Sequence, residues 1–93
     1  MKEINLRRVA VLGGVRTPFC RSHTAFAELS NLDMLTTALT GLSERFSLDG
    51  LHIDEVVGGA VVKHAKDWNL AREAVIGSPL AATTPGITMM QAC

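Results

Sequence analysis

The sequence is poor in aromatic residues, in cysteine and in unbalanced charge. Aromatic residues make up 4% of its 93 positions, none is tyrosine, and only two positions are cysteine. Nine basic residues balance nine acidic ones and form no stripe, which excludes a nucleic-acid-binding surface of the usual kind. The two cysteines and three scattered histidines have no metal-ligand spacing. We therefore expect free thiols, no metal, and a reducing, cytoplasmic location.

Long apolar runs are also missing. No run approaches the roughly 20 apolar residues that a membrane-crossing helix needs, so we expect no membrane span. Residues 1–8 carry charges between short apolar stretches and lack the apolar centre of a secretory signal peptide. Hydrophobic residues nevertheless make up 47% of the chain. This balance indicates a portion of one soluble globular domain.

The first half of the chain shows strand, loop and helix signals in turn. Val9-Ala10-Val11-Leu12, closed by two glycines, is typical of a strand buried on both faces and predicts a strand over about 8–13. Residues 15–30 have no steady period and predict a long, functional loop. Apolar residues then recur at spacings of three and four, which predicts a helix over 32–46 with Ser30 or Asn31 as its cap.

The second half repeats the alternation. It predicts a buried strand over 56–62, a short helix over 70–76 that begins after Asn69, and a third strand over 86–91. Gly41 in the first helix and the glycine pair 58–59 in the second strand are costly unless a neighbour approaches closely there. The order strand, helix, strand, helix, strand predicts an α/β fold with a parallel sheet.

Cys93 is the candidate catalytic residue. The run from Thr84 to Cys93 predicts a turn, a short buried strand, and then a thiol where a helix should begin. Backbone N–H groups at a helix start favour the thiolate, and the thiolate is the nucleophile. Cys93 is thus the predicted nucleophile of a covalent catalyst. The 93 residues carry little else of such a site, so we expect the chain alone to be inactive.

Four motifs resemble the N-terminal segment of the thiolase family. They are Arg16-Thr17-Pro18, Gly58-Gly59-Ala60-Val61, Asn69-Leu70-Ala71-Arg72-Glu73 and the segment from Pro85 to Cys93, and their order and spacing match. The similarity is greatest to the fatty-acid-oxidation branch, which includes the trifunctional protein β-subunit. On this resemblance, residues 1–93 are the N-terminal portion of the thiolase N-terminal domain, with an incomplete thiolase-like fold.

The resemblance implies an acyl-CoA:CoA acyltransferase that cleaves 3-oxoacyl-CoA with CoA, or runs the reverse condensation. Cys93 would form the thioester, acetyl-CoA would leave, and a second CoA would take the acyl group. CoA and acyl-CoA thioesters are then substrates, and no cofactor is needed. The family's catalytic histidine and second cysteine lie beyond position 93. A homo-oligomer is implied, or a hetero-oligomer with a hydratase/dehydrogenase subunit.

Two other functions stay open. Several residues are interpreted as structural or incidental. A non-enzymatic thiolase-like module that binds lipid or acyl-CoA is one alternative, and a ketoacyl-synthase-type condensing enzyme is the other. Cys20 is interpreted as an incidental thiol, and Arg16 and Arg72 as buried structural cations that pair with carboxylates or carbonyls and fix loops. Met89-Met90 is interpreted as core filling, with contact to an acyl tail as the alternative.

Overall fold

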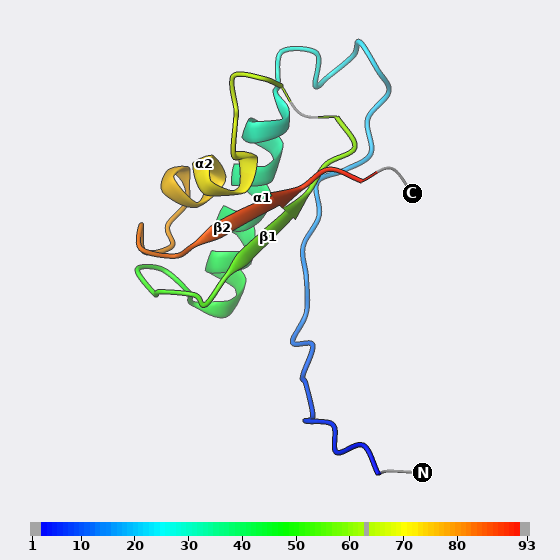
Figure 1. Cartoon of the computed structure of the whole chain (residues 1–93). Helices are drawn as coiled ribbons and strands as arrows, with labels where there is room; N and C mark the ends of the chain where they lie inside the picture. Colours follow the sequence, from blue (N-terminus) through cyan, green and yellow to red (C-terminus); the bar gives the residue numbers. More distant parts are fainter. Residues whose placement is uncertain (1–2, 63, 92–93) are drawn as a thin grey trace.

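A computed structural model describes residues 3–62 and 64–91. Its elements are α1 (Asn31–Phe46), β1 (Val56–Gly59), α2 (Leu70–Gly77) and β2 (Gly86–Met89). The two strands pair in parallel, with Val56 opposite Gly86 and Gly59 opposite Met89. Helix α2 contacts both strands and α1, and the N-terminal part of the chain, blue in Figure 1, runs away from this body as an extended trace. The predicted α/β arrangement with a parallel sheet is confirmed.

Helix α1 forms where the apolar spacing predicts it. Ser30 is its cap: the Ser30 hydroxyl accepts the Asp33 N–H at 3.1 Å, and the Asp33 carboxylate accepts the Ser30 N–H at 2.9 Å. This reciprocal pair satisfies two donors that a helix start otherwise leaves free. Asn31 is not the cap, because its side-chain amide donates instead to the carbonyl of Val62 at 2.9 Å.

The predicted first strand is absent. Residues 8–13 have no strand or helix, and Val9, Val11 and Leu12 are 79–91% exposed. An apolar run predicts a tendency to be buried, but a strand also needs a partner edge, and neither described strand pairs with this segment. The following stretch, 15–30, is irregular with turns, as predicted.

The later elements follow the sequence prediction: α2 ends one residue later than predicted, and the two strands end earlier. Helix α2 covers the predicted 70–76, and its cap is Asn69, whose side chain accepts the Arg72 N–H. The predicted strands 56–62 and 86–91 are realised only in their first four residues each. Within the described residues each strand has one partner, and the regular register between them ends at the pair Gly59 and Met89.

Only some glycines sit where a neighbour approaches closely. A Cβ on Gly58 would lie 3.1 Å from the Ala71 Cβ, so the predicted close approach is confirmed there. A Cβ on Gly86 would lie 2.9 Å from the Arg72 nitrogen, which puts the backbone of α2 directly against β2. The same expectation is wrong for Gly41 and Gly59, where an added Cβ meets nothing within 4 Å.

The core lies on α2. Its buried apolar residues come mainly from that helix, together with the loop that follows it: Leu70, Ala71, Ala74, Val75 and Leu80. Small alanine side chains on the buried face let α2 approach the glycines of both strands. Along the described part of the chain, no helix combines the length and the apolar character that a membrane crossing requires.

Candidate active site

The carboxyl ends of β1 and β2 lie side by side. Beyond the paired residues, the Ala60 N–H donates to the Met89 carbonyl at 3.0 Å, which keeps the two chains together as they leave the sheet. A hollow of about 280 Å³ opens here, lined by Gly59, Ala60, Val61, Met89 and Gln91. Ligands of open parallel sheets bind at this edge, outside the carboxyl ends of the strands. The edge is therefore the candidate site.

Cys93, the predicted nucleophile, lies outside the described residues. The structure follows β2 and its continuation as far as Gln91, two positions before the cysteine in the sequence. Gln91 itself lines the hollow at the sheet edge. The described residues thus lead the chain to the candidate site, and the role of Cys93 stays a prediction.

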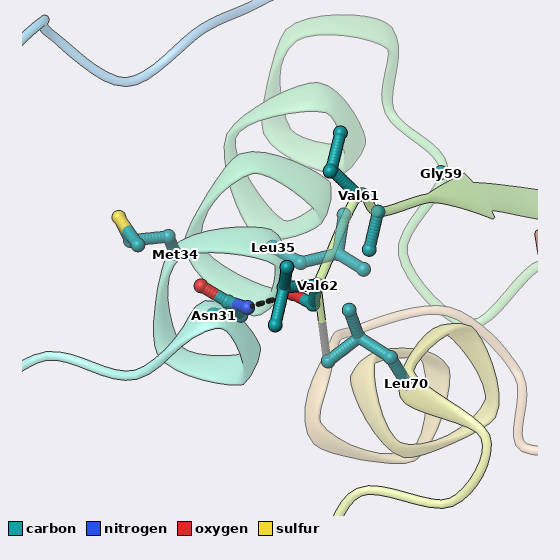
Figure 2. A pocket seen from close by; sticks show the side chains of 8 residues that line it. Asn31, Met34, Leu35, Gly59, Val61, Val62 and Leu70 are labelled. Atoms are coloured by element: carbon teal, nitrogen blue, oxygen red, sulfur yellow. Dashed lines mark hydrogen bonds between the residues drawn. The ribbon is translucent and has the colours of Figure 1, made fainter. Parts of the chain in front are cut away.

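A second hollow adjoins the same edge (Figure 2). Its volume is about 340 Å³, and its lining comes from α1, the end of β1 and the start of α2: Asn31, Met34, Leu35, Gly59, Ala60, Val61, Val62 and Leu70. Figure 2 shows the hydrogen bond that the Asn31 amide donates to the Val62 carbonyl, which connects α1 to the segment that follows β1. Among the described residues that line it, none has a titratable side chain, so this described lining suits an apolar group.

Two residues of the helix motif have clear structural roles. The Asn69 side chain caps α2, and its amide also donates to the Gly86 carbonyl at 3.0 Å. The Arg72 guanidinium donates to the Ala82 carbonyl at 2.6 Å and to the Thr84 carbonyl at 2.9 Å. Arg72 thereby fixes the loop into β2, which confirms its predicted role as a structural cation.

Arg16 does not have the buried role predicted for it. Its side chain is exposed and lies over the Phe19 ring, with the guanidinium carbon 4.1 Å from the ring centre. The hydrogen bond that its side chain donates to the Thr17 carbonyl is long, at 3.4 Å. Burial needs surrounding structure, and the segment around Arg16 is irregular and exposed. The contacts seen for Arg16 are with nearby residues of the same segment, Thr17 and Phe19.

Met89 and Met90 are not core filling. Each side chain is about half exposed, at 49% and 50%. Met89 lines the hollow at the sheet edge, which keeps open the alternative of contact with a bound apolar group. An apolar pair in a short strand predicts burial, but β2 is covered by α2 on one face only.

Cys20 lines a third hollow, beside the start of α1. This hollow has a volume of about 520 Å³ and is also lined by His23 and His64. The Thr24 hydroxyl, 3.2 Å from the exposed Cys20 thiol, holds the pKa of Cys20 below its ordinary value. Within the described ranges, no group of three or more His, Cys, Asp or Glu side chains gathers as a metal site would require.

Thr88 is the residue that the sequence interpretation missed. Its hydroxyl donates to the Asn69 carboxamide oxygen at 2.7 Å and accepts the Ala71 N–H at 2.9 Å. A signal was present, because Thr88 is the one polar residue between apolar neighbours in the run Ile87-Thr88-Met89-Met90. A polar side chain in a short buried strand needs a partner, and here the partner is the cap of α2.

Comparison with known proteins identifies the class. The chain belongs to the thiolase family, because the family model of the thiolase N-terminal domain matches residues 9–93. The predicted resemblance is confirmed by this match, which includes the segment from Pro85 to Cys93.

Individual relatives agree with that class. The human trifunctional enzyme subunit beta, mitochondrial, is 40% identical over 89 residues, which cover 96% of this chain and 19% of that protein. The 3-ketoacyl-CoA thiolase of Aeromonas salmonicida (strain A449) is 38% identical over 86 residues, which cover 92% of this chain and 20% of that protein. The chain therefore spans about a fifth of the length of these relatives, and the predicted branch is confirmed.

Proposed function

We propose that the protein carrying this chain is an acyl-CoA:CoA C-acyltransferase of the thiolase type. The observation that carries the proposal is the family match over residues 9–93, a span that includes the predicted nucleophile. Support also comes from relatives named as a 3-ketoacyl-CoA thiolase and a trifunctional enzyme subunit. The fold adds a strand, β2, whose described continuation to Gln91 lines a hollow at the carboxyl edge of the sheet.

The proposed reaction is a balanced exchange in two steps. The Cys93 thiolate attacks the 3-oxo carbon of 3-oxoacyl-CoA, the bond between C2 and C3 breaks, and C2 takes up a proton as acetyl-CoA leaves. The thiolate of a second CoA then attacks the Cys93 thioester and releases the shortened acyl-CoA and the free cysteine. CoA is a substrate, and the reaction needs no bound cofactor or metal. The reverse direction is a condensation of two acyl-CoA molecules.

The proposed setting is an oligomer in a reducing, cytoplasmic compartment. The subunits are either copies of one chain or a thiolase chain with a hydratase/dehydrogenase subunit, for which the name of the trifunctional relatives gives support. The compartment rests on the low cysteine content and on the exposed free thiol of Cys20.

The test is thiolysis by the full-length gene product and by two single-cysteine variants. Cleavage of 3-oxoacyl-CoA should require CoA and should fall on the order of 1,000-fold or more in Cys93→Ser, because the nucleophile is lost. Cys20→Ser is the matched control and should retain the rate, because Cys20 lies in a separate hollow. The 93-residue chain alone should show no turnover.

Three results would contradict the proposal. Undiminished thiolysis by Cys93→Ser would show that Cys93 is not the nucleophile. Binding of acyl-CoA without any turnover by the unmodified protein would favour the non-enzymatic module. Activity with acyl carrier protein thioesters in place of CoA thioesters would favour a ketoacyl-synthase-type enzyme.

A further inference from the structure

The first turn of α2 is joined to β2 by a cluster of side-chain hydrogen bonds, here called the clasp, made by Asn69 and Thr88. The Asn69 carboxamide oxygen accepts the Thr88 hydroxyl at 2.7 Å, and the Asn69 amide donates to the Gly86 carbonyl at 3.0 Å. The Thr88 hydroxyl in turn accepts the Ala71 N–H at 2.9 Å. Three hydrogen bonds thus run between the helix start and the strand, in addition to the cap on Arg72.

The clasp lies beside a close contact between the backbones of β2 and α2. At Gly86 an added Cβ would lie 2.9 Å from the Arg72 nitrogen and 3.0 Å from the Ala71 carbonyl carbon, so strand and helix backbones already touch. The atoms of the clasp are part-buried, where hydrogen bonds are stronger than in water. The clasp therefore restrains β2 from sliding along the strand direction and from moving away from α2.

β2 has two element contacts in the part of the chain that the structure describes. Among the described residues its one paired neighbour is β1, over four residue pairs. Its second contact is with α2, which packs against one face of the strand. The clasp supplies the polar and directional part of the second contact.

We infer that Asn69 and Thr88 are positioning residues for the nucleophile segment, an inference that rests on the proposed function. Thr88 lies five positions before Cys93, and the described chain between them continues β2 to the hollow at the sheet edge. A displacement of about 1 Å at the reacting atoms can cost about 100-fold in rate. Loss of the clasp therefore lowers the rate of the chemical step and leaves substrate binding nearly unchanged.

The experiment compares two threonine variants of the full-length gene product. Thr88→Val removes the hydroxyl and keeps the branched shape, while Thr88→Ser keeps the hydroxyl. Thr84→Val is the matched control: the Thr84 hydroxyl also accepts a backbone N–H, that of Ile53 at 3.1 Å, and Thr84 is fully buried. The readouts are the thiolysis kcat per titrated reactive thiol, the KM for each substrate, and the melting temperature.

The expected pattern separates positioning from stability. Thr88→Val should lower kcat per reactive thiol by about 10- to 100-fold with KM within about twofold, and Thr88→Ser should restore most of the loss. Thr84→Val should lower the melting temperature and retain kcat per reactive thiol. The reactive thiol is counted as the one that forms an acyl-enzyme in a burst with 3-oxoacyl-CoA, so that neither unfolded protein nor the exposed Cys20 thiol enters the count.

A second variant covers the case in which Thr88→Val does not fold. Asn69→Ser keeps a capping oxygen for α2 and removes the amide that holds the Gly86 carbonyl, so it should show the same loss of kcat per reactive thiol. Unchanged kcat per thiol in both the Thr88 and Asn69 variants would overturn the inference, as would an equal loss in Thr84→Val. Absence of cleavage by the unmodified protein would instead overturn the proposed function, so the two failures are distinct.

Discussion

The chain before α1 and the body that follows it have similar apolar runs and opposite degrees of burial. Val11 is 91% exposed, whereas Val75 in α2 is fully buried. Both residues stand in short apolar stretches, so hydrophobicity does not separate them. What separates them is the polar framework around each stretch. α2 has a cap, a clasp and two strands against it, and residues 8–13 have no paired strand.

Gly13 and Gly14, which end the exposed apolar run, contact the end of α1. The Arg45 guanidinium donates to the Gly14 carbonyl at 2.6 Å, and Gly13 lies against the Phe46 ring. Two contacts of this kind do not offset the entropy of ordering the residues before them. The difference between the two regions shows that apolar residues are buried where backbone hydrogen bonds are satisfied at the same time.

A glycine-to-alanine substitution should lower the free energy of unfolding strongly in the body and hardly at all in the exposed segment. Gly86→Ala puts a Cβ at 2.9–3.1 Å from the backbone of α2 and should cost about 3 kcal/mol of unfolding free energy, because the strand must move. Gly14→Ala meets nothing within 4 Å and should change stability by less than about 0.5 kcal/mol. Urea unfolding of the 93-residue chain, followed by far-UV circular dichroism, measures both. A harmless Gly86→Ala would show that α2 and β2 are not in contact.

A matched pair of valines tests burial directly. Val75→Ala removes two methyl groups from a fully buried side chain and should cost about 2 kcal/mol in the same unfolding experiment. Val11→Ala removes the same groups from a side chain that is already in water, so its effect should be near zero. A comparable cost at Val11 would mean that residues 8–13 are packed after all, as the sequence predicts.

Local signals predicted the helices well because their causes are local. The apolar spacing and Ser30 define α1, while Asn69 and Gly77 mark the limits of α2 within one residue. Capping needs only residues three or four positions apart, so it can be recognised in the sequence. The order of elements from α1 onward and the parallel pairing of β1 with β2 followed from the same reasoning.

Features that depend on distant residues could not be predicted. The pairing of residues 8–13 requires a free strand edge at the right place, and sequence pattern carries no such information. The clasp joins Asn69 to Thr88, which are 19 positions apart, and only the fold shows that they meet. At the candidate site, the sequence predicted Cys93 and the structure leads to it as far as Gln91, while the hollow at the sheet edge came from the fold alone.

The smallest expected effect lies at the boundary between the two regions, at Asp33 in the first turn of α1. The Ser30 backbone N–H, with a further contribution from the Ser30 hydroxyl, holds the pKa of Asp33 below its ordinary value. A carboxyl group whose pKa is lowered on folding stabilises the fold above its ordinary pKa, and this contribution is lost as the pH falls through the lowered value. Asp33→Asn should therefore destabilise the chain slightly at neutral pH. It should also reduce the fall of the unfolding free energy below about pH 4, here called the acid limb.

The measurement is the urea midpoint of the 93-residue chain as a function of pH. Ser30→Ala is the control: it removes the hydroxyl that accepts the Asp33 N–H and keeps the backbone N–H that the carboxylate accepts. It should lower the midpoint at every pH and leave most of the acid limb in place. An acid limb that is equally steep in wild type and Asp33→Asn would show that the capping box does not hold this boundary. The start of the packed region would then depend on the apolar stripe of α1 alone.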